Sequence, residues 1–170
     1  PETVSYLAAS FSNVYLLKDT SGKDRVATSH ADLSNLFLVR GAEGNYDSWL
    51  KAVGGSYDGF LLSTANTFAA ELDAVIEYAI AEQSDKAAET ARRIEGVVDP
   101  LFREASKLPF GNPFANANKA IDHHFAWGDR AGYRRSPITH SGHRIPDSLI
   151  ELARDLLDAE GFNVGGGYMD

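Results

Sequence analysis

A lysine ends a short apolar run near the start of this sequence. The run VYLL leads directly into Lys18, and the polar loop DTSG follows. If the run is a strand, Lys18 shares one face with Val14 and Leu16, while Tyr15 and Leu17 face the other side. An amine that rises from such an apolar floor is partly withheld from water, which favours its neutral and nucleophilic form. A neutral amine can form an imine with a ketone, and the protonated imine then acts as an electron sink for making or breaking carbon–carbon bonds. The simpler alternative is that Lys18 ends the strand and extends its ammonium into water.

Five histidines make metal binding the other chemistry to consider. His140 and His143 stand close together in THSGH, and His123 and His124 are adjacent. Adjacent residues of a helix point about 100° apart, so they do not share one ion. No HExxH motif or run of carboxylates accompanies these histidines. We therefore expect neither a metal nor an organic cofactor, and His140 with His143 is the alternative if a metal does bind.

Three short apolar runs must form the elements that position Lys18. They are VYLL (14–17), LFLV (36–39) and GFLL (59–62). Unbroken apolar runs of this length are typical of strands buried on both faces of a parallel sheet. Apolar residues at helical spacing occupy the intervals between them, at 26–33 and 46–53. The order predicts strand, helix, strand, helix, strand, which is a βαβαβ unit.

The remainder of the chain is predicted to be helical. After Asn66, two apolar stripes at helical spacing run over 68–80 and 87–102. Asn66 is expected to cap the first of these helices. Ser148 with Glu151 fits a capping box at the start of a last helix.

Three strands do not close a sheet by themselves. A (β/α)₈ barrel needs about 250 residues, and this chain has 170. We therefore expect an α/β fold that is the C-terminal part of a TIM barrel. Its last three βα units would occupy residues 1–82, and a C-terminal helical extension would occupy residues 83–170. An open three-stranded α/β sandwich is the alternative.

Composition excludes several classes of partner. The formal net charge is −8, so nucleic acid and anionic membrane surfaces are not expected to bind. No apolar run approaches the roughly 20 residues that span a bilayer, and the N-terminus lacks the pattern of a secretory signal. The absence of cysteine fits a cytoplasmic protein. The chain does not begin with methionine, so we expect a processed product or a fragment.

Several segments together resemble the dihydrodipicolinate synthase / N-acetylneuraminate lyase family. NVYLLKDTSG resembles the strand of that family that carries its Schiff-base lysine, and LFLVRGAEG resembles the next strand with its glycine turn. LKAVGGSYDGFLLSTAN is similar to the family's double-glycine, strand and A-N pattern. NPFANANK (112–119) and RRSP (134–137) resemble the start of a C-terminal helix and the segment that crosses after it. The resemblance covers nearly all 170 residues.

The resemblance implies particular roles for particular residues. Lys18 would form the imine with pyruvate or another 2-keto acid. Gly41 or Gly44, and Leu61, would line the pyruvate pocket. Two residues expected at strand ends, Thr20 and Ser63, would meet substrate hydroxyl groups.

The resemblance also implies a class I lyase or aldolase of the dihydrodipicolinate synthase type, usually a homotetramer. Its relatives begin with five further βα units, which carry the groups that hold the carboxylate and relay protons. This chain would therefore need an N-terminal half-barrel and would be inactive alone. Phe68 and Ala69 stand where many relatives have proline. A 2-keto-3-deoxy sugar-acid aldolase or dehydratase is one alternative function, and a non-catalytic half-barrel interaction module is another.

Overall fold

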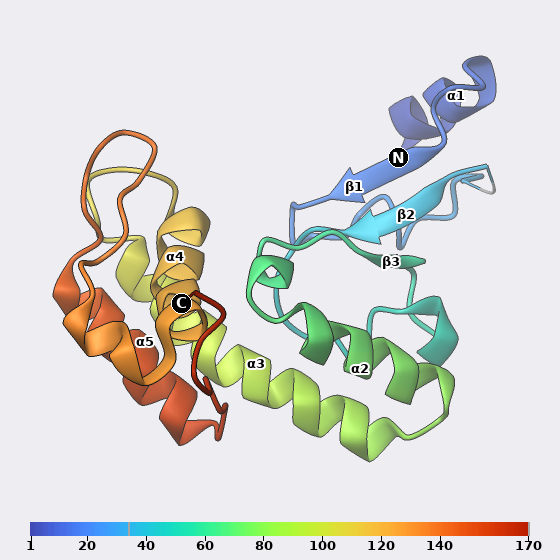
Figure 1. The fold of residues 1–170 in the computed structure, drawn as a ribbon. Helices are drawn as coiled ribbons and strands as arrows, with labels where there is room; N and C mark the ends of the chain where they lie inside the picture. The colour runs from blue at the N-terminus through green and yellow to red at the C-terminus, as the bar shows by residue number, and fades with distance from the viewer. Residues whose placement is uncertain (34, 170) are drawn as a thin grey trace. The chain divides into compact units, whose positions relative to one another are not determined.

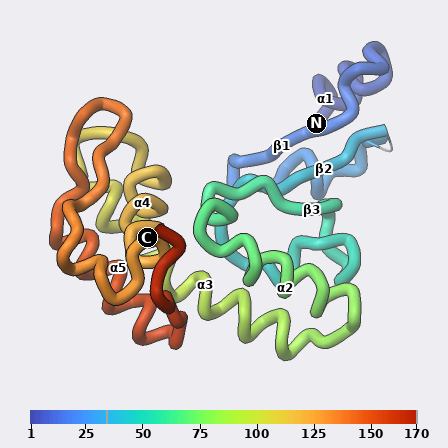
Figure 2. The backbone as a smooth tube through the Cα atoms, viewed as in Figure 1, coloured from blue at the N-terminus to red at the C-terminus, as the bar shows by residue number. Residues whose placement is uncertain are grey.

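The structure is a computed structural model that describes residues 1–33 and 35–169. The chain forms two compact units, residues 1–62 with 72–91 and residues 63–71 with 92–170. Figures 1 and 2 trace the backbone through both units. Helices α2 (Ala69–Ile80) and α3 (Ser84–Ala105) each contribute residues to both. The expected boundary between residues 82 and 83 falls in the turn that joins these helices.

The first unit contains the predicted parallel sheet. Its strands lie in the order β1 (Leu16–Asp19), β2 (Phe37–Arg40) and β3 (Gly59–Phe60), after a helix α1 (Glu2–Ser10) (Figure 1). The pairing is in register, so that Lys18 lies beside Val39 in the neighbouring strand. Because the strands are parallel, their carboxyl ends meet at one edge of the sheet, where Lys18 lies.

The apolar core of the first unit lies on one face of this sheet. The fully buried members of the core are Ala8, Leu36, Leu38 and Tyr57, and partly buried side chains of Val4, Val14, Leu17, Ala27, Leu33 and Trp49 pack against them. The prediction that Tyr15 and Leu17 lie on the packed face and Val14 on the opposite face is therefore correct for Leu17 and wrong for Val14 and Tyr15. Val14 packs into the core, and the Tyr15 side chain is 69% exposed. The reason is that both residues precede the strand, which begins only at Leu16, so strand alternation does not govern them.

The two predicted crossover helices are largely absent. Residues 25–28 form a single turn, and the second interval contains only a short 3₁₀ helix, Lys51–Val53. In the first interval the Thr28 and Ser29 hydroxyls donate to the backbone carbonyls of Asp24 and Val26. Side chains that bond to the local backbone in this way compete with helix formation.

The second unit is helical. A 3₁₀ helix (Thr64–Asn66) precedes α2, and α4 (Pro113–Trp127), a second 3₁₀ helix (Gly128–Tyr133) and α5 (Asp147–Ala159) follow α3. Buried residues of the two predicted stripes recur at helical spacing in α2 and α3, for example Leu72, Val75, Ile94, Val98 and Leu101. Ile80, at the end of the first stripe, is 62% exposed and is an exception. Within the helices that the structure describes, none has the length and apolar character of a membrane span.

The predicted helix caps are wrong in detail. Asn66 is the last residue of the 3₁₀ helix Thr64–Asn66. Its side chain donates to the Ser63 carbonyl, so it does not cap α2. Ser148 lies inside the first turn of α5, and the residue before that helix provides no side-chain cap. Asn112 does cap a helix. Its side-chain oxygen accepts hydrogen bonds from the Phe114 and Ala115 N–H groups at the start of α4.

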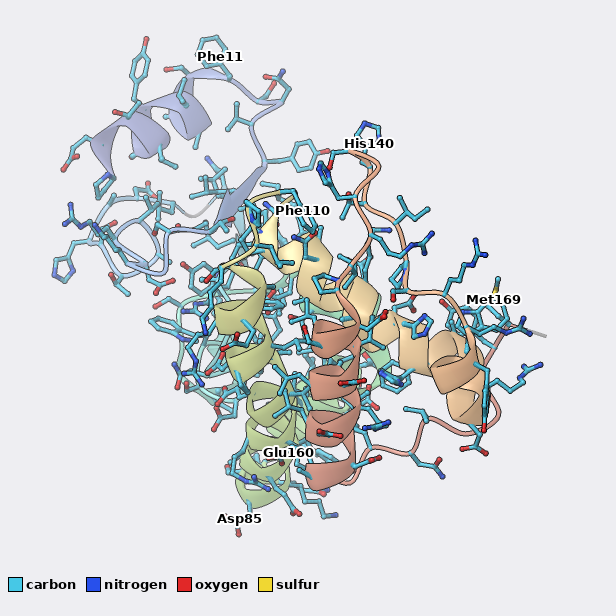
Figure 3. The ribbon with its side chains drawn as sticks, turned by 90° about the vertical axis from the view of Figure 1, so that its left-hand side faces the viewer. Phe11, Asp85, Phe110, His140, Glu160 and Met169 are labelled. Atoms are coloured by element: carbon cyan, nitrogen blue, oxygen red, sulfur yellow. The ribbon has the colours of Figure 1, made fainter. Side chains whose placement is uncertain are left out.

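Residues near the C-terminus, up to Met169, pack closely against the end of α4. The Tyr168 and Met169 N–H groups donate to the carbonyls of Phe125 and Ala126 (Met169 is labelled in Figure 3). These are carbonyls near the C-terminal end of a helix, where partners within the helix run out. The approach is so close that Gly128 has no room for a Cβ, because the backbone of residues 165–167 occupies that position. The glycines at 165–167 therefore allow the backbone near the C-terminus to approach the backbone of Gly128.

Candidate functional site

One face of the sheet in the first unit is left open. Leu16, Phe37 and Leu61 are 44%, 51% and 52% exposed. Leu16 and Phe37 are register partners and share this face, as Lys18 and Val39 do two residues further on. Leu38, on the opposite face, is only 4% exposed. The sheet thus has one buried face and a second face on which Leu16 and Phe37 are exposed, although Val39 on that second face is buried.

Lys18 lies within β1 and is exposed on the open face. The prediction that it shares this face with Leu16 agrees with the burial pattern of the strand. The floor beside it is Val39, which is 5% exposed. The cover that would withhold the amine from water is not provided by the described part of this unit.

Thr20 and Gly41 converge on Lys18. Gly41 is buried, and its N–H donates to the Asp19 carbonyl at 2.7 Å. A Cβ at position 41 would overlap Lys18 Cε and would lie 2.6 Å from Thr20 Oγ1. The lysine side chain therefore crosses the space that any other residue at position 41 would fill. Three of the predicted site residues are thus brought together at the carboxyl ends of β1 and β2.

The other predicted site residues lie elsewhere. The Leu61 N–H donates to the Arg40 carbonyl at 2.9 Å, so Leu61 extends β3 and projects from its end as an exposed side chain. Gly44 adopts a positive φ of 86°, and its carbonyl accepts a hydrogen bond from Arg40 Nη1 at 2.8 Å. Gly44 thus serves as a turn residue. Ser63 belongs to the second unit, at the start of the 3₁₀ helix Thr64–Asn66.

A buried ionic cluster lies next to this site, and the sequence did not reveal it. Arg40 and Asp24 are 4% and 3% exposed, and Arg40 Nε donates to Asp24 Oδ1 at 3.1 Å. The Tyr57 hydroxyl donates to the same oxygen at 2.7 Å. Burial alone would raise the pKa of Asp24, but the hydrogen bonds from Arg40 and Tyr57 and the charge of Arg40 together hold it below its ordinary value. The ionised carboxylate is therefore the stable form in the folded unit.

The same cluster acts on Tyr57. Burial, the hydrogen bond to Asp24 and the nearby charges of Asp19 and Asp24 raise the pKa of the phenol far above its ordinary value. Tyr57 therefore remains a neutral donor to Asp24. The sequence signal that could have indicated the cluster is an arginine at the end of an apolar strand, since a buried guanidinium requires a carboxylate partner.

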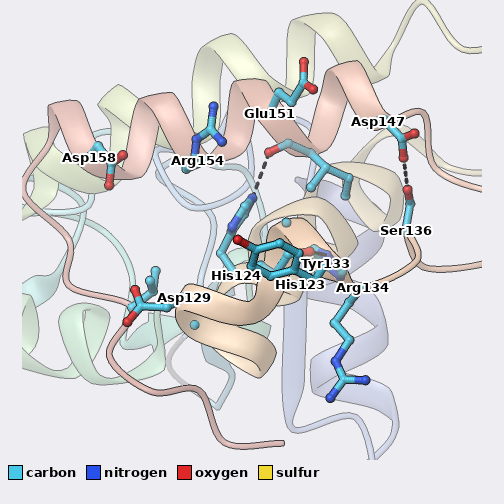
Figure 4. Close-up of a pocket in the computed structure, with 15 residues that line it drawn as sticks. His123, His124, Asp129, Tyr133, Arg134, Ser136, Asp147, Glu151, Arg154 and Asp158 are labelled. Atoms are coloured by element: carbon cyan, nitrogen blue, oxygen red, sulfur yellow. Dashed lines mark hydrogen bonds between the residues drawn. The ribbon is translucent and has the colours of Figure 1, made fainter.

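The second unit contains a polar cavity of about 660 Å³. Figure 4 shows it between α4, the loop after it and α5. His123 and His124 lie at its base, each with Nε2 directed at a backbone carbonyl, of Ala131 at 3.0 Å and of Ile150 at 2.8 Å. Both histidines are 5% exposed, so they are structural members of the helix packing. The charged side chains around the rim are Asp129, Arg134, Asp147, Glu151, Arg154 and Asp158.

Two further histidines, His140 and His143, are not among the residues that line this cavity. His143 stacks on Phe110 with ring centroids 4.6 Å apart, and its Nδ1 lies 3.0 Å from Ser141 Oγ. His140 is exposed in the same loop. In residues 1–33 and 35–169, no three His, Cys, Asp or Glu side chains are placed so that they could hold a metal ion. That the protein functions without a metal ion therefore remains a prediction from the sequence.

Comparisons with known proteins give the fold. No family model matches the chain, and no curated protein matches it. A monomeric variant of dihydrodipicolinate synthase matches 95% of the chain with a TM-score of 0.66 and 20% sequence identity. A second dihydrodipicolinate synthase structure matches 95% with a TM-score of 0.53 and 19% identity. The chain spans about half the length of both. The fold that the sequence resemblance implies is therefore confirmed: the chain has the fold of one half of a dihydrodipicolinate synthase barrel.

Proposed function

We propose that this chain supplies the imine-forming lysine of a class I lyase that acts on pyruvate or another 2-keto acid. The observation that carries the proposal is the convergence of Lys18, Thr20 and Gly41 on the open face at the carboxyl ends of β1 and β2. Active sites of (β/α)₈ barrels are built at this end of the strands. The fold shared with dihydrodipicolinate synthases supports the same chemistry.

The proposed reaction begins at Lys18 Nζ. The neutral amine attacks the ketone carbon of the 2-keto acid, and the carbinolamine that forms takes up one proton and loses water to give a protonated imine. Removal of a proton from the adjacent carbon gives an enamine, whose carbon adds to an aldehyde. Hydrolysis then releases the product and restores the amine. The absence of a side chain at Gly41 leaves the space in which the Lys18 side chain lies.

The proposed active form contains more than this chain. Eight strands close a barrel of this type, and the described residues supply three. The missing strands would cover Leu16, Phe37 and Leu61, and would supply the groups that move protons. The proposed enzyme is a cytoplasmic homo-oligomer that uses no metal or organic cofactor. Its action on a sugar acid instead of pyruvate is the alternative within the same chemistry.

Borohydride trapping tests the proposal. The complete protein that carries this chain is incubated with pyruvate, treated with sodium borohydride, digested, and searched for the reduced adduct by mass spectrometry. The adduct is expected on Lys18, and Lys18→Arg should abolish it. Lys23→Arg, a change at an exposed lysine of the following loop, is the matched control and should leave it intact. An adduct on another lysine would refute the assignment. The absence of any adduct with pyruvate or sugar-derived 2-keto acids would favour a non-catalytic interaction module.

A further inference from the structure

The buried Arg40 joins the two loops that follow β1 and β2. Arg40 is the last residue of β2, and four hydrogen bonds hold its guanidinium. Two go to the carboxylate of Asp24, in the loop after β1, at 3.1 and 3.4 Å. Two go to the carbonyls of Ala42 and Gly44, in the loop after β2, both at 2.8 Å. One planar cation therefore fixes both loops, because its donors have a rigid relative geometry.

Two aromatic side chains, Trp49 and Tyr57, also contact the Arg40–Asp24 ion pair. Arg40 lies over the ring of Trp49, 4.5 Å from its centroid. The Trp49 and Tyr57 rings pack edge to face at 5.9 Å, and the Tyr57 hydroxyl reaches Asp24 at 2.7 Å. Asp24 itself has a positive φ of 53°, a conformation that costs energy in a residue with a side chain. Such a conformation persists where surrounding contacts hold it, and here Arg40 and Tyr57 provide those contacts.

The cluster lies one residue away from Lys18 in the register of the sheet. Arg40 is the register partner of Asp19. The residues before and after Arg40 in the chain are the ones that lie against Lys18. Val39 is the register partner of Lys18, and Gly41 leaves the space that the Lys18 side chain crosses. The Gly41 N–H also donates to the Asp19 carbonyl at 2.7 Å. A shift of the β2 end would therefore move the floor beneath the lysine.

From these contacts we infer that Arg40 is a positioning residue for Lys18, and that Asp24 and Tyr57 hold Arg40 in place. The inference rests on the proposed function, because it assigns Lys18 a reaction. Arg40 does not itself meet the substrate, since its side chain is buried and engaged on the core face of the sheet. Its role is to keep Gly41 and the ends of β1 and β2 fixed while Lys18 attacks.

The test compares Arg40→Lys with the wild-type protein. Lysine keeps the charge but cannot form the two-pronged bond to Asp24 or reach both carbonyls. Two quantities are measured on the complete protein: the rate and final yield of the Lys18–pyruvate adduct, and the hydrogen exchange rate of the Gly41 amide. A small misplacement of a reacting group can cost on the order of 100-fold in rate. We expect the adduct rate to fall about 10- to 100-fold at unchanged yield, with faster exchange at Gly41.

Two further variants make the result decisive. Tyr57→Phe removes one hydroxyl only and should give a smaller fall in rate in the same direction, even if Arg40→Lys proves hard to fold. Arg92→Lys alters an exposed ion pair with Glu160 and should change neither quantity. A lower yield at an unchanged rate would overturn the inference, because it would mean that Arg40 supports folding only. If the wild-type protein forms no adduct, the proposed function fails, and Gly41 exchange alone decides whether Arg40 fixes the strand ends.

Discussion

His124 is a buried titratable side chain with a backbone partner. Its Nε2 lies 2.8 Å from the Ile150 carbonyl, which can only accept, so this nitrogen carries a proton (Figure 4). Burial lowers the pKa of His124 below its ordinary value, and the charges of His123 and Arg154 act in the same direction. The bond to Ile150 and the charge of Asp158 oppose this shift without cancelling it. The neutral imidazole is therefore the form that the packed helices favour.

The stability of the protein should fall in mild acid because of His124. The unfolded chain takes up this proton near pH 6.5, whereas the folded chain takes it up only at lower pH. The contribution of neutral His124 is therefore complete above about pH 6.5 and is lost as the pH falls below it. Urea unfolding at several values between pH 5 and pH 8 should show this loss. His124→Gln, which keeps a donor near Ile150, should flatten the profile.

His143 supplies the control for this prediction. It is exposed and stacked on Phe110, so His143→Gln makes the same chemical change at a histidine that is not buried. An unchanged slope in His124→Gln would show that other groups cause the loss of stability in acid.

At the scale of single residues, the sequence indicates which side chains are candidates for a site better than it indicates which residues they contact. Lys18 could be selected because a cation at the end of an apolar run is conspicuous. Its contact with Gly41 could be expected only from family resemblance, since no local pattern shows which residues meet across two strands. The pairing of Arg40 with Asp24 joins residues 16 positions apart through a turn with a positive φ. Such a pairing depends on the packing of the whole unit.

At the scale of elements, strands were predicted more reliably than the connections between them. Unbroken apolar runs correctly predicted the three strands of a parallel sheet. Burial on both faces, which such runs indicate, is found on only one face of the described sheet, because Leu16 and Phe37 are exposed on the other. The intervals at 26–33 and 46–53 also have apolar residues at helical spacing, yet they form turns and one 3₁₀ helix. In the first interval, local hydroxyl-to-backbone bonds outweigh the apolar period.

Asn112 should stabilise α4 measurably. Its side-chain oxygen accepts from two N–H groups that have no partner within the helix. Asn112→Ala should therefore lower the free energy of unfolding by about 0.5–2 kcal/mol, as measured in urea. Ser148→Ala is the matched control at the start of α5, where no side chain caps the helix, and it should cost less than about 0.5 kcal/mol. Equal effects of the two changes would restore the capping box that the sequence suggested.

At the scale of the whole molecule, the first unit resembles a part cut from a larger closed sheet. Both outer strands have one edge with no partner strand among the described residues, and the open face carries exposed apolar side chains. Unpaired edges and apolar faces invite association with other chains. The chain studied by itself should therefore self-associate and should bind hydrophobic dyes.

Two neighbouring residues of β2 test this expectation. Phe37 is 51% exposed on the open face, whereas Leu38 is 4% exposed on the core face. In the isolated chain, Phe37→Thr should reduce self-association in sedimentation velocity and reduce dye fluorescence with little loss of stability. Leu38→Thr should instead cost about 2–5 kcal/mol, the usual range for truncating a large buried side chain. A monomeric wild-type chain that binds no dye would contradict the half-barrel interpretation.

The docking of the C-terminal residues on α4 has a consequence for how this chain can evolve. A Cβ at Gly128 would lie 2.7 Å from the Gly167 nitrogen, and one at Gly167 would lie 2.8 Å from the Gly128 nitrogen. Each glycine thus occupies space that a mutation in the other would need, and both have a positive φ. Substitutions at the two positions should therefore be coupled during evolution. A lineage that keeps the docked tail should keep both glycines. A lineage that loses the tail should still keep Gly128, because its φ of 53° and ψ of −133° lie outside the left-handed region that asparagine and aspartate tolerate, and only position 167 should become free to vary.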